Sequence, residues 1–190
     1  MKLSHLPNGI TLLRILLVAP ITWLLWQMRY PEALVLMAVA GASDAVDGVL
    51  ARRFGWGTEF GAFVDPLADK VMVVALFLAL TFQGVIPLWL AAVVVGRDAV
   101  ILTGAGVYRL WFHEISMSPT MISKANTAVQ IVVLLLVLFG LCGFGAASDL
   151  ALRAADPWCL YLVAGLSVAS GVDYVVTWSL KAWRNKHPVP

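Results

Sequence analysis

The sequence predicts an all-α integral membrane protein, and three observations predict it. Hydrophobic residues make up 61% of the 190 residues and charged residues only 13%, whereas an average soluble domain is about 45–50% apolar and about 25% charged. Six stretches have the roughly 20 mostly apolar residues that a transmembrane helix needs. The basic residues outside these stretches are also divided unequally between the two sides. We therefore expect one membrane domain over residues 1–190, neither soluble nor disordered.

The six predicted spans are separated by short polar or basic segments. The second and third spans are interrupted by aspartates, but we keep them because their apolar remainder has no other place to be buried. The segment 145–156, rich in Gly, Ala, Ser and Asp, is interpreted as a loop. The predicted spans are 10–28, 33–51, 62–82, 86–108, 123–144 and 158–180.

An even number of spans places both termini on the same side of the membrane. Outside the spans, seven Lys and Arg residues lie on that side and two on the other, so the positive-inside rule places both termini in the cytoplasm. The net charge of +2 is too small to suggest a nucleic-acid partner. The seven residues are Lys2, Arg52, Arg53, Arg109, Lys181, Arg184 and Lys186, and the two are Arg29 and Arg153.

Charged residues inside the spans fall mainly in the half nearer the cytoplasm. Charges at membrane depth are costly and normally face a bundle interior or a wet cavity, so we expect a polar active-site cavity open to the cytoplasm. Arg14, Arg97 and Lys124 are candidate ligands for a substrate phosphate. Arg97 could instead pair with its neighbour Asp98, and Lys124 could extend to the membrane interface.

Four aspartates form the densest polar feature of the chain. Asp44 and Asp47 are three residues apart, and Asp65 and Asp69 are four apart, so each pair shares one helix face. The short connection between the two helices makes them antiparallel neighbours and brings the four carboxylates together.

Four ionised carboxylates in a partly apolar site require either protonation or bound cations. Hard oxygen donors without nearby His or Cys favour two Mg²⁺ or Mn²⁺ ions over zinc. Two such ions suit phosphoryl-type displacement. Two alternatives remain, namely buried salt bridges with the basic residues of the other spans, and an ion or proton pathway.

The residues around these aspartates resemble a known family. Their pattern, D-x2-D-G-x2-A-R-x8-G-x3-D-x3-D, is that of the CDP-alcohol phosphotransferases, also called phosphatidyltransferases. Every fixed position is filled, by Asp44, Asp47, Gly48, Ala51, Arg52, Gly61, Asp65 and Asp69.

The resemblance implies a reaction and assigns residues to it. A hydroxyl group attacks the β-phosphorus of a CDP-linked alcohol, usually CDP-diacylglycerol, and CMP leaves. The four aspartates are implied to be metal ligands, and Asp69 also the catalytic base. The CMP moiety is implied to contact Asp47, Gly48, Ala51, Arg52 and Gly61.

The acceptor is suggested by further similarities. Gly96-Arg97-Asp98 and the segment 119–130, which contains Ser123-Lys124-Ala125-Asn126-Thr127, look like the CMP-forming cardiolipin synthase branch, whose acceptor is phosphatidylglycerol. The alternative is a phosphatidylglycerophosphate synthase, which uses glycerol 3-phosphate and tends to carry G-K-x-K-T in the fifth helix. An alternative of another class is a transporter or a non-catalytic membrane scaffold.

The resemblance also implies a homodimer surrounded by membrane lipids. The N-terminal residues lack the composition of a transit peptide. We therefore expect the bacterial inner membrane rather than the mitochondrial inner membrane, with the active site facing the cytoplasm.

Overall fold

The structure is a computed structural model that describes residues 6–54, 59–112 and 120–186, with side chains described over 13–43, 70–104 and 120–179. Every regular element in these ranges is a helix, so the all-α prediction is confirmed for the described residues. The α-helices are α1 (Leu6–Trp26), α2 (Tyr30–Phe54), α3 (Glu59–Phe82), α4 (Leu88–Phe112), α5 (Met121–Leu141), α6 (Ala146–Ala154) and α7 (Leu160–Lys186).

The helices form two compact units. The first comprises Met1–Ile86 with Leu134–Arg153, and the second comprises Pro87–Val133 with Ala154–Pro190. Helix α5 contributes its C-terminal part to the first unit and its N-terminal part to the second.

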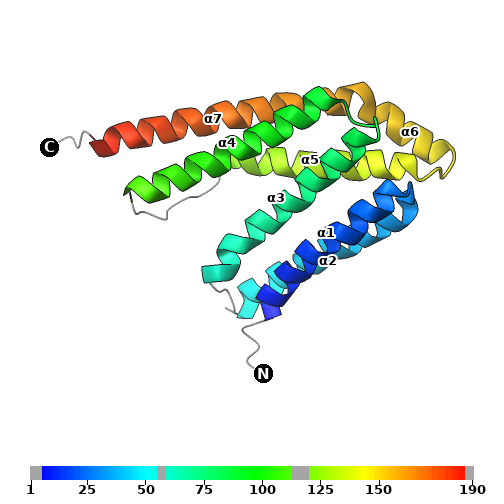
Figure 1. The fold of residues 1–190 in the computed structure, drawn as a ribbon, viewed down its shortest axis with the longest axis horizontal. Coiled ribbons are helices and arrows are strands. Elements are labelled where there is room, and N and C mark those ends of the chain that lie inside the picture. The colour runs from blue at the N-terminus through cyan, green and yellow to red at the C-terminus, as the bar shows by residue number, and fades with distance from the viewer. Residues whose placement is uncertain (1–5, 55–58, 113–119, 187–190) are drawn as a thin grey trace. The chain divides into compact units, whose positions relative to one another are not determined.

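In the first unit, α1 packs against both α2 and α3 (Figure 1). Ile21 and Leu25 of α1 and Phe77 and Leu80 of α3 are almost completely buried. Within each helix these residues lie three or four positions apart, so they share one face. Between membrane helices such contacts stabilise mainly through van der Waals packing. This packing places the helices that carry the aspartate motif around α1.

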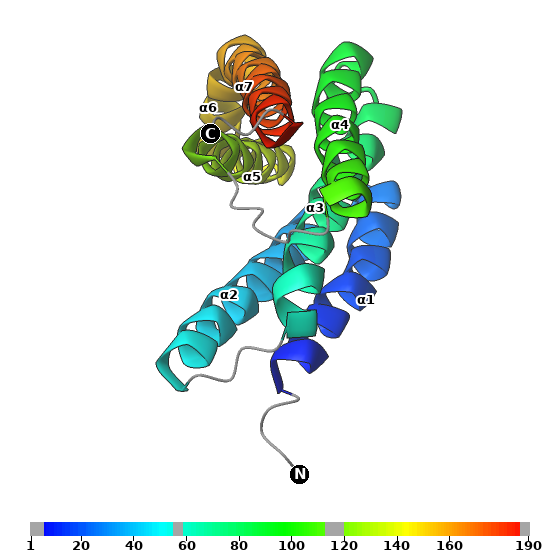
Figure 2. The same ribbon diagram turned by 90° about the vertical axis from the view of Figure 1, so that its left-hand side faces the viewer.

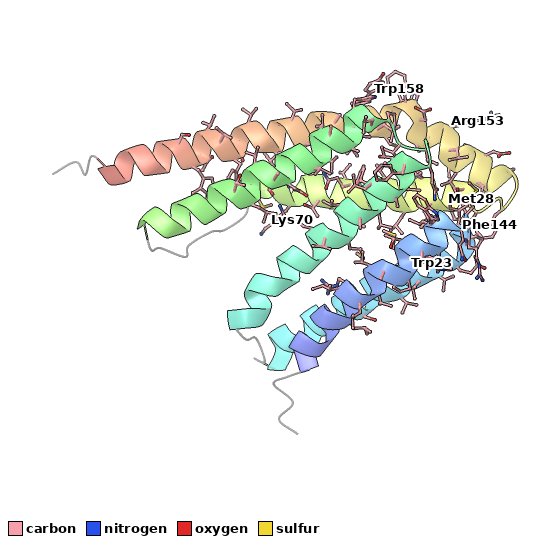
Figure 3. The ribbon with its side chains drawn as sticks, viewed as in Figure 1. Trp23, Met28, Lys70, Phe144, Arg153 and Trp158 are labelled. Carbon is pink, nitrogen blue, oxygen red and sulfur yellow. The ribbon has the colours of Figure 1, made fainter. Side chains whose placement is uncertain are left out.

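A side-chain bridge joins the end of α3 to the turn between α1 and α2. The amide nitrogen of Gln83 donates to the carbonyl oxygen of Leu25, and its Oε1 accepts a hydrogen bond from the Tyr30 hydroxyl at 3.1 Å. The turn contains Met28 with a φ of 57°, a conformation uncommon for a residue other than glycine (Figure 3). The bridge therefore connects all three helices at the end of the unit opposite the aspartate motif.

The loop predicted over 145–156 is wrong for most of its length, because residues Ala146–Ala154 form helix α6. The reason is local hydrogen bonding by Ser148, which is buried. Its hydroxyl accepts from the Phe144 N–H and donates to the Phe139 carbonyl, both at 2.9 Å. The composition suggested a loop, but alanine and leucine favour a helix, and the N–H groups of Ser148 and Asp149 both donate to the Gly145 carbonyl where α6 begins. A turn of π-helix, Ala155–Cys159, follows, and Asp156 within it is not helical.

The second unit is built on the packing of α4 against α7. The rings of Trp89 and Tyr161 stack with centroids 5.8 Å apart. Nearer the C-terminal ends of both helices, Tyr174 of α7 lies against Gly104 of α4. Helix α7 also lies beside α5, as Figure 2 shows and hydrogen bonds between them confirm.

The structure supports a membrane location. Two described helical stretches, Met121–Leu141 and Ala146–Ser179, are long and apolar enough to cross a bilayer. Large apolar side chains are exposed on several helices, including Trp23 and Trp158 (Figure 3), and a soluble protein would bury many of these. The number of six spans and the cytoplasmic position of the termini stay predictions.

Candidate active site

The aspartate motif lies on two helices of the first unit. Asp44, Asp47, Gly48, Ala51 and Arg52 fall within α2, and Gly61, Asp65 and Asp69 fall within α3. The side chains of residues 44–69 lie outside the described residues. The backbone is helical at every motif position.

Helical backbone gives the motif spacing its meaning. Because α2 continues through Asp44 and Asp47, and α3 through Asp65 and Asp69, each pair lies on one face of its helix. Helix α2 ends at Phe54 and α3 begins at Glu59. The two helices run in opposite directions (Figure 1), as the short connection predicted.

The donor set of the motif fits a hard divalent cation. Four carboxylates at these spacings offer only oxygen ligands, which Mg²⁺ and Mn²⁺ prefer. Among the side chains that the structure describes, no group of three or more His, Cys, Asp or Glu residues could hold a metal. The predicted ligands lie outside that set, so the two-metal site stays a prediction.

The three predicted phosphate ligands differ in exposure. Arg14 lies on α1, in the first unit, and is only 4% exposed. Lys124 lies in the first turn of α5, in the second unit, and is exposed. That turn is capped by Thr120, whose Oγ1 accepts from the Ser123 N–H at 3.2 Å. Of these two, Lys124 is the more accessible to a ligand.

Arg97 is buried and donates hydrogen bonds to three residues. It is 6% exposed, and its Nη1 lies 2.5 Å from Oδ1 of Asp98. Its Nη2 donates to the hydroxyls of Ser123 and Ser170, each at 2.6 Å. The pairing with Asp98, which the sequence left open as an alternative, is therefore present. A role in binding substrate stays a prediction.

Sequence reasoning missed the hydrogen-bonded polar side chains of α5 and α7 that lie in the same unit as Arg97 and Asp98. We call them the polar seam, and it joins α4, α5 and α7. In it, Gln130 donates to the Ser167 hydroxyl at 3.1 Å, and Ser167 donates to Oδ1 of Asn126 at 3.0 Å. The signal was a three- to four-residue spacing of polar residues within apolar helices. The seam comprises Arg97, Asp98, Ser123, Asn126, Gln130, Ser167 and Ser170.

A cavity of about 500 Å³ lies between α4 and α7 in the second unit. Its lining is largely apolar and includes Gly96, Gly171 and Val172, with Arg97 and Ser167 as its polar members. The described residues that line it include no carboxylate. It does bring Arg97 to the border of an open space.

Comparison with known proteins identifies the relatives of this chain. A family model described as CDP-alcohol phosphatidyltransferase matches residues 4–172. A Schizosaccharomyces pombe "Cardiolipin synthase (CMP-forming) / mitochondrial hydrolase fusion protein" is 33% identical over 189 residues, which cover 90% of this chain and 31% of that protein.

Two further relatives carry the names of two different enzymes. A probable cardiolipin synthase (CMP-forming) of Drosophila melanogaster is 33% identical over 68% of this chain and 45% of its own length. A CDP-diacylglycerol–glycerol-3-phosphate 3-phosphatidyltransferase of Pseudomonas fluorescens is 40% identical over 70% of this chain and 72% of its own length. The chain thus spans less than half of each of these two cardiolipin synthases.

Proposed function

The chain belongs to the CDP-alcohol phosphatidyltransferase family and is a phosphatidyltransferase, and from this premise we propose that it is a CMP-forming cardiolipin synthase. It would transfer the phosphatidyl group of CDP-diacylglycerol to phosphatidylglycerol and release CMP. The observation that carries the reaction is the complete aspartate motif on α2 and α3. Membership in this enzyme family favours an enzyme over the alternative of a transporter or a non-catalytic membrane scaffold.

The chemistry follows from the motif residues. Asp69 accepts the proton of the phosphatidylglycerol hydroxyl, whose oxygen forms a bond to the β-phosphorus. The bond between that phosphorus and the bridging pyrophosphate oxygen breaks, and the electron pair leaves with CMP. A carboxylate that is ionised at neutral pH is a competent base for this step.

The remaining motif residues bind and orient the nucleotide. Arg52 can hold a pyrophosphate oxygen bidentately. Gly48 and Gly61 lack side chains that would obstruct the approach of CMP, and Ala51 is small. Asp44, Asp47, Asp65 and Asp69 would hold two Mg²⁺ or Mn²⁺ ions, which neutralise negative charge on the pyrophosphate when bound.

Arg14, Arg97 and Lys124 would bind the phosphate of the acceptor. The choice of phosphatidylglycerol is supported by Arg97-Asp98 and Ser123-Lys124-Ala125-Asn126-Thr127, and by the Schizosaccharomyces pombe relative. A second candidate is phosphatidylglycerophosphate synthesis, favoured by the 40% identity of the Pseudomonas fluorescens relative, most of whose length the chain covers.

We further propose that the enzyme is a homodimer with one membrane domain per chain. The proposed location is the bacterial inner membrane, with the site facing the cytoplasm. Thiol labelling of single cysteines at the two termini, in spheroplasts and in inverted vesicles, tests this orientation. Labelling of both termini only in inverted vesicles supports it.

The activity is tested with the purified full chain, labelled CDP-diacylglycerol, Mg²⁺ or Mn²⁺, and one acceptor at a time. Cardiolipin formed with phosphatidylglycerol alone is expected. Product with glycerol 3-phosphate alone would select the second candidate, and no CMP release with either acceptor would overturn the proposal.

Asp69→Asn tests the assignment of the base. It should lower turnover by about 10²–10⁴-fold, since it removes the base, while thermal unfolding stays unchanged. Glu59→Gln on the same helix is the matched control and should retain activity. Wild-type turnover in Asp69→Asn would remove Asp69 from this role.

A further inference from the structure

The guanidinium group of Arg97 is held by three helices of the second unit. It belongs to α4, and it donates to Ser123 of α5 and to Ser170 of α7. The Ser170 hydroxyl accepts two hydrogen bonds from Arg97, one from Nη2 at 2.6 Å and one from Nε at 3.2 Å. Ser170 is completely buried, so no solvent competes for its hydroxyl.

These contacts use four of the five N–H groups of the Arg97 guanidinium. A guanidinium has five N–H groups in a rigid plane. Nε uses its single N–H on Ser170, Nη2 uses both of its N–H groups on the two serines, and Nη1 uses one on Asp98. One N–H of Nη1 has no partner among the described residues. The arrangement therefore fixes the plane of the group while sparing one donor.

Ser123 and Ser170 could serve only to stabilise the packing of the helices, or they could hold Arg97 in the position that its function requires. An unrestrained arginine side chain carries about 2 kcal/mol of rotamer entropy, which a ligand must otherwise overcome when it orders the group. Ser170 and Ser123 remove that freedom before a ligand arrives. Arg97 is also among the residues that line the cavity between α4 and α7.

We infer that Ser170, assisted by Ser123, is a positioning residue that holds the Arg97 guanidinium in place for the phosphate of the acceptor. The inference rests on the proposed function, in which Arg97 binds that phosphate. Ser170 itself touches no substrate, and its effect passes entirely through Arg97.

Two serines of α7 provide a matched comparison. Ser167 and Ser170 are both completely buried and lie one turn apart. Ser167 bonds to Asn126 and Gln130, whereas Ser170 bonds to Arg97. Ser167→Ala and Ser170→Ala should therefore lower thermal stability to a similar extent.

Their kinetics should differ. Ser170→Ala should raise the KM for the acceptor about tenfold, because it removes two hydrogen bonds to a charged group, with a smaller change in kcat. Ser167→Ala should leave that KM within a factor of about two. Equal acceptor KM values for the two variants would overturn the inference.

A second pair of variants covers the case in which Ser170→Ala does not fold. Ser123 is only partly buried, so its substitutions are better tolerated. Ser123→Ala should raise the acceptor KM, and Ser123→Thr, which keeps the hydroxyl, should restore it. Equal KM values for these two variants would also contradict the positioning role.

The dependence on Arg97 separates this inference from the proposed function. In an Arg97→Lys background, adding Ser170→Ala should change the acceptor KM by less than about twofold, because the group that it positions is gone. A full effect in that background would overturn the inference alone. An unchanged KM in Arg97→Lys itself would remove Arg97 from the proposed acceptor ligands and overturn the inference with it. A wild-type protein without activity on either acceptor would overturn the proposed function as a whole.

Discussion

The ion pair between Arg97 and Asp98 allows a quantitative prediction about stability. The two side chains are 3% and 7% exposed, and their charged atoms lie 2.5 Å apart. Replacing Arg97 by methionine keeps most of the side-chain volume but removes the cation that Arg97 places beside the buried Asp98 carboxylate. Breaking a buried pair in this way costs about 3–5 kcal/mol of unfolding free energy.

Removing the second charge should recover most of that loss. The double variant Arg97→Met with Asp98→Asn removes both charges of the pair, and replacing a buried pair by neutral groups is often close to neutral. We expect the double variant to lie within about 2 kcal/mol of the wild type, so the two substitutions are strongly coupled. Activity should not recover, because the cation proposed to bind the acceptor is still absent.

Unfolding by SDS in mixed detergent micelles, followed by circular dichroism, measures these free energies. The exposed pair of Arg29 and Glu32 is the control, since its side chains are 54% and 46% exposed at a separation of 2.8 Å. Arg29→Met should cost far less than Arg97→Met, because exposed ion pairs contribute little to stability. The reasoning fails if Arg97→Met costs no more than this control, or if Asp98→Asn restores no stability.

Three further predictions concern the first unit. Ser148→Ala should destabilise the protein by about 1–3 kcal/mol, because it leaves the Phe144 N–H without its acceptor and removes one of the two hydrogen bonds to the Phe139 carbonyl; unchanged thermal unfolding would contradict this. Gly140→Ala should cost about 1–3 kcal/mol in the same assay, because a Cβ there would lie 2.6 Å from Cγ of Leu152; adding Leu152→Ala should lessen this loss, and a larger loss in the double variant would refute the clash. The hydrogen bond from Arg29 lowers the pKa of Glu32 below its ordinary value of 4.5, so its stabilisation is present above that value and disappears as the pH falls through the folded-state pKa. Wild-type protein should therefore lose slightly more stability than Glu32→Gln between about pH 6 and pH 3, and identical profiles would show that the pair contributes nothing.

The sequence by itself determined the all-α class, the membrane character and the family. These follow from local properties, namely apolar runs of membrane length and a motif whose eight positions lie within 26 residues. Helical periodicity also determined that the aspartates of each pair share a face, since this depends only on their separation along one helix. Such features do not require knowledge of which helices touch.

Helix α6 shows where local interpretation failed. Its composition resembled a loop, and the Ser148 hydrogen bonds that connect it to the end of α5 could not be recognised from residue types alone. Whether a serine caps a helix or interrupts it depends on the backbone conformation around it.

Only the tertiary structure decided the surroundings of Arg97. The sequence offered Asp98 as a neighbour and a substrate phosphate as a ligand, but Ser123 and Ser170 lie 26 and 73 positions away. A hydrogen bond between distant residues depends on which helix faces meet and at what register, and apolar helices can pack in several such ways. The packing of α4 with α5 and α7 therefore determines that this buried cation is surrounded by hydroxyl groups.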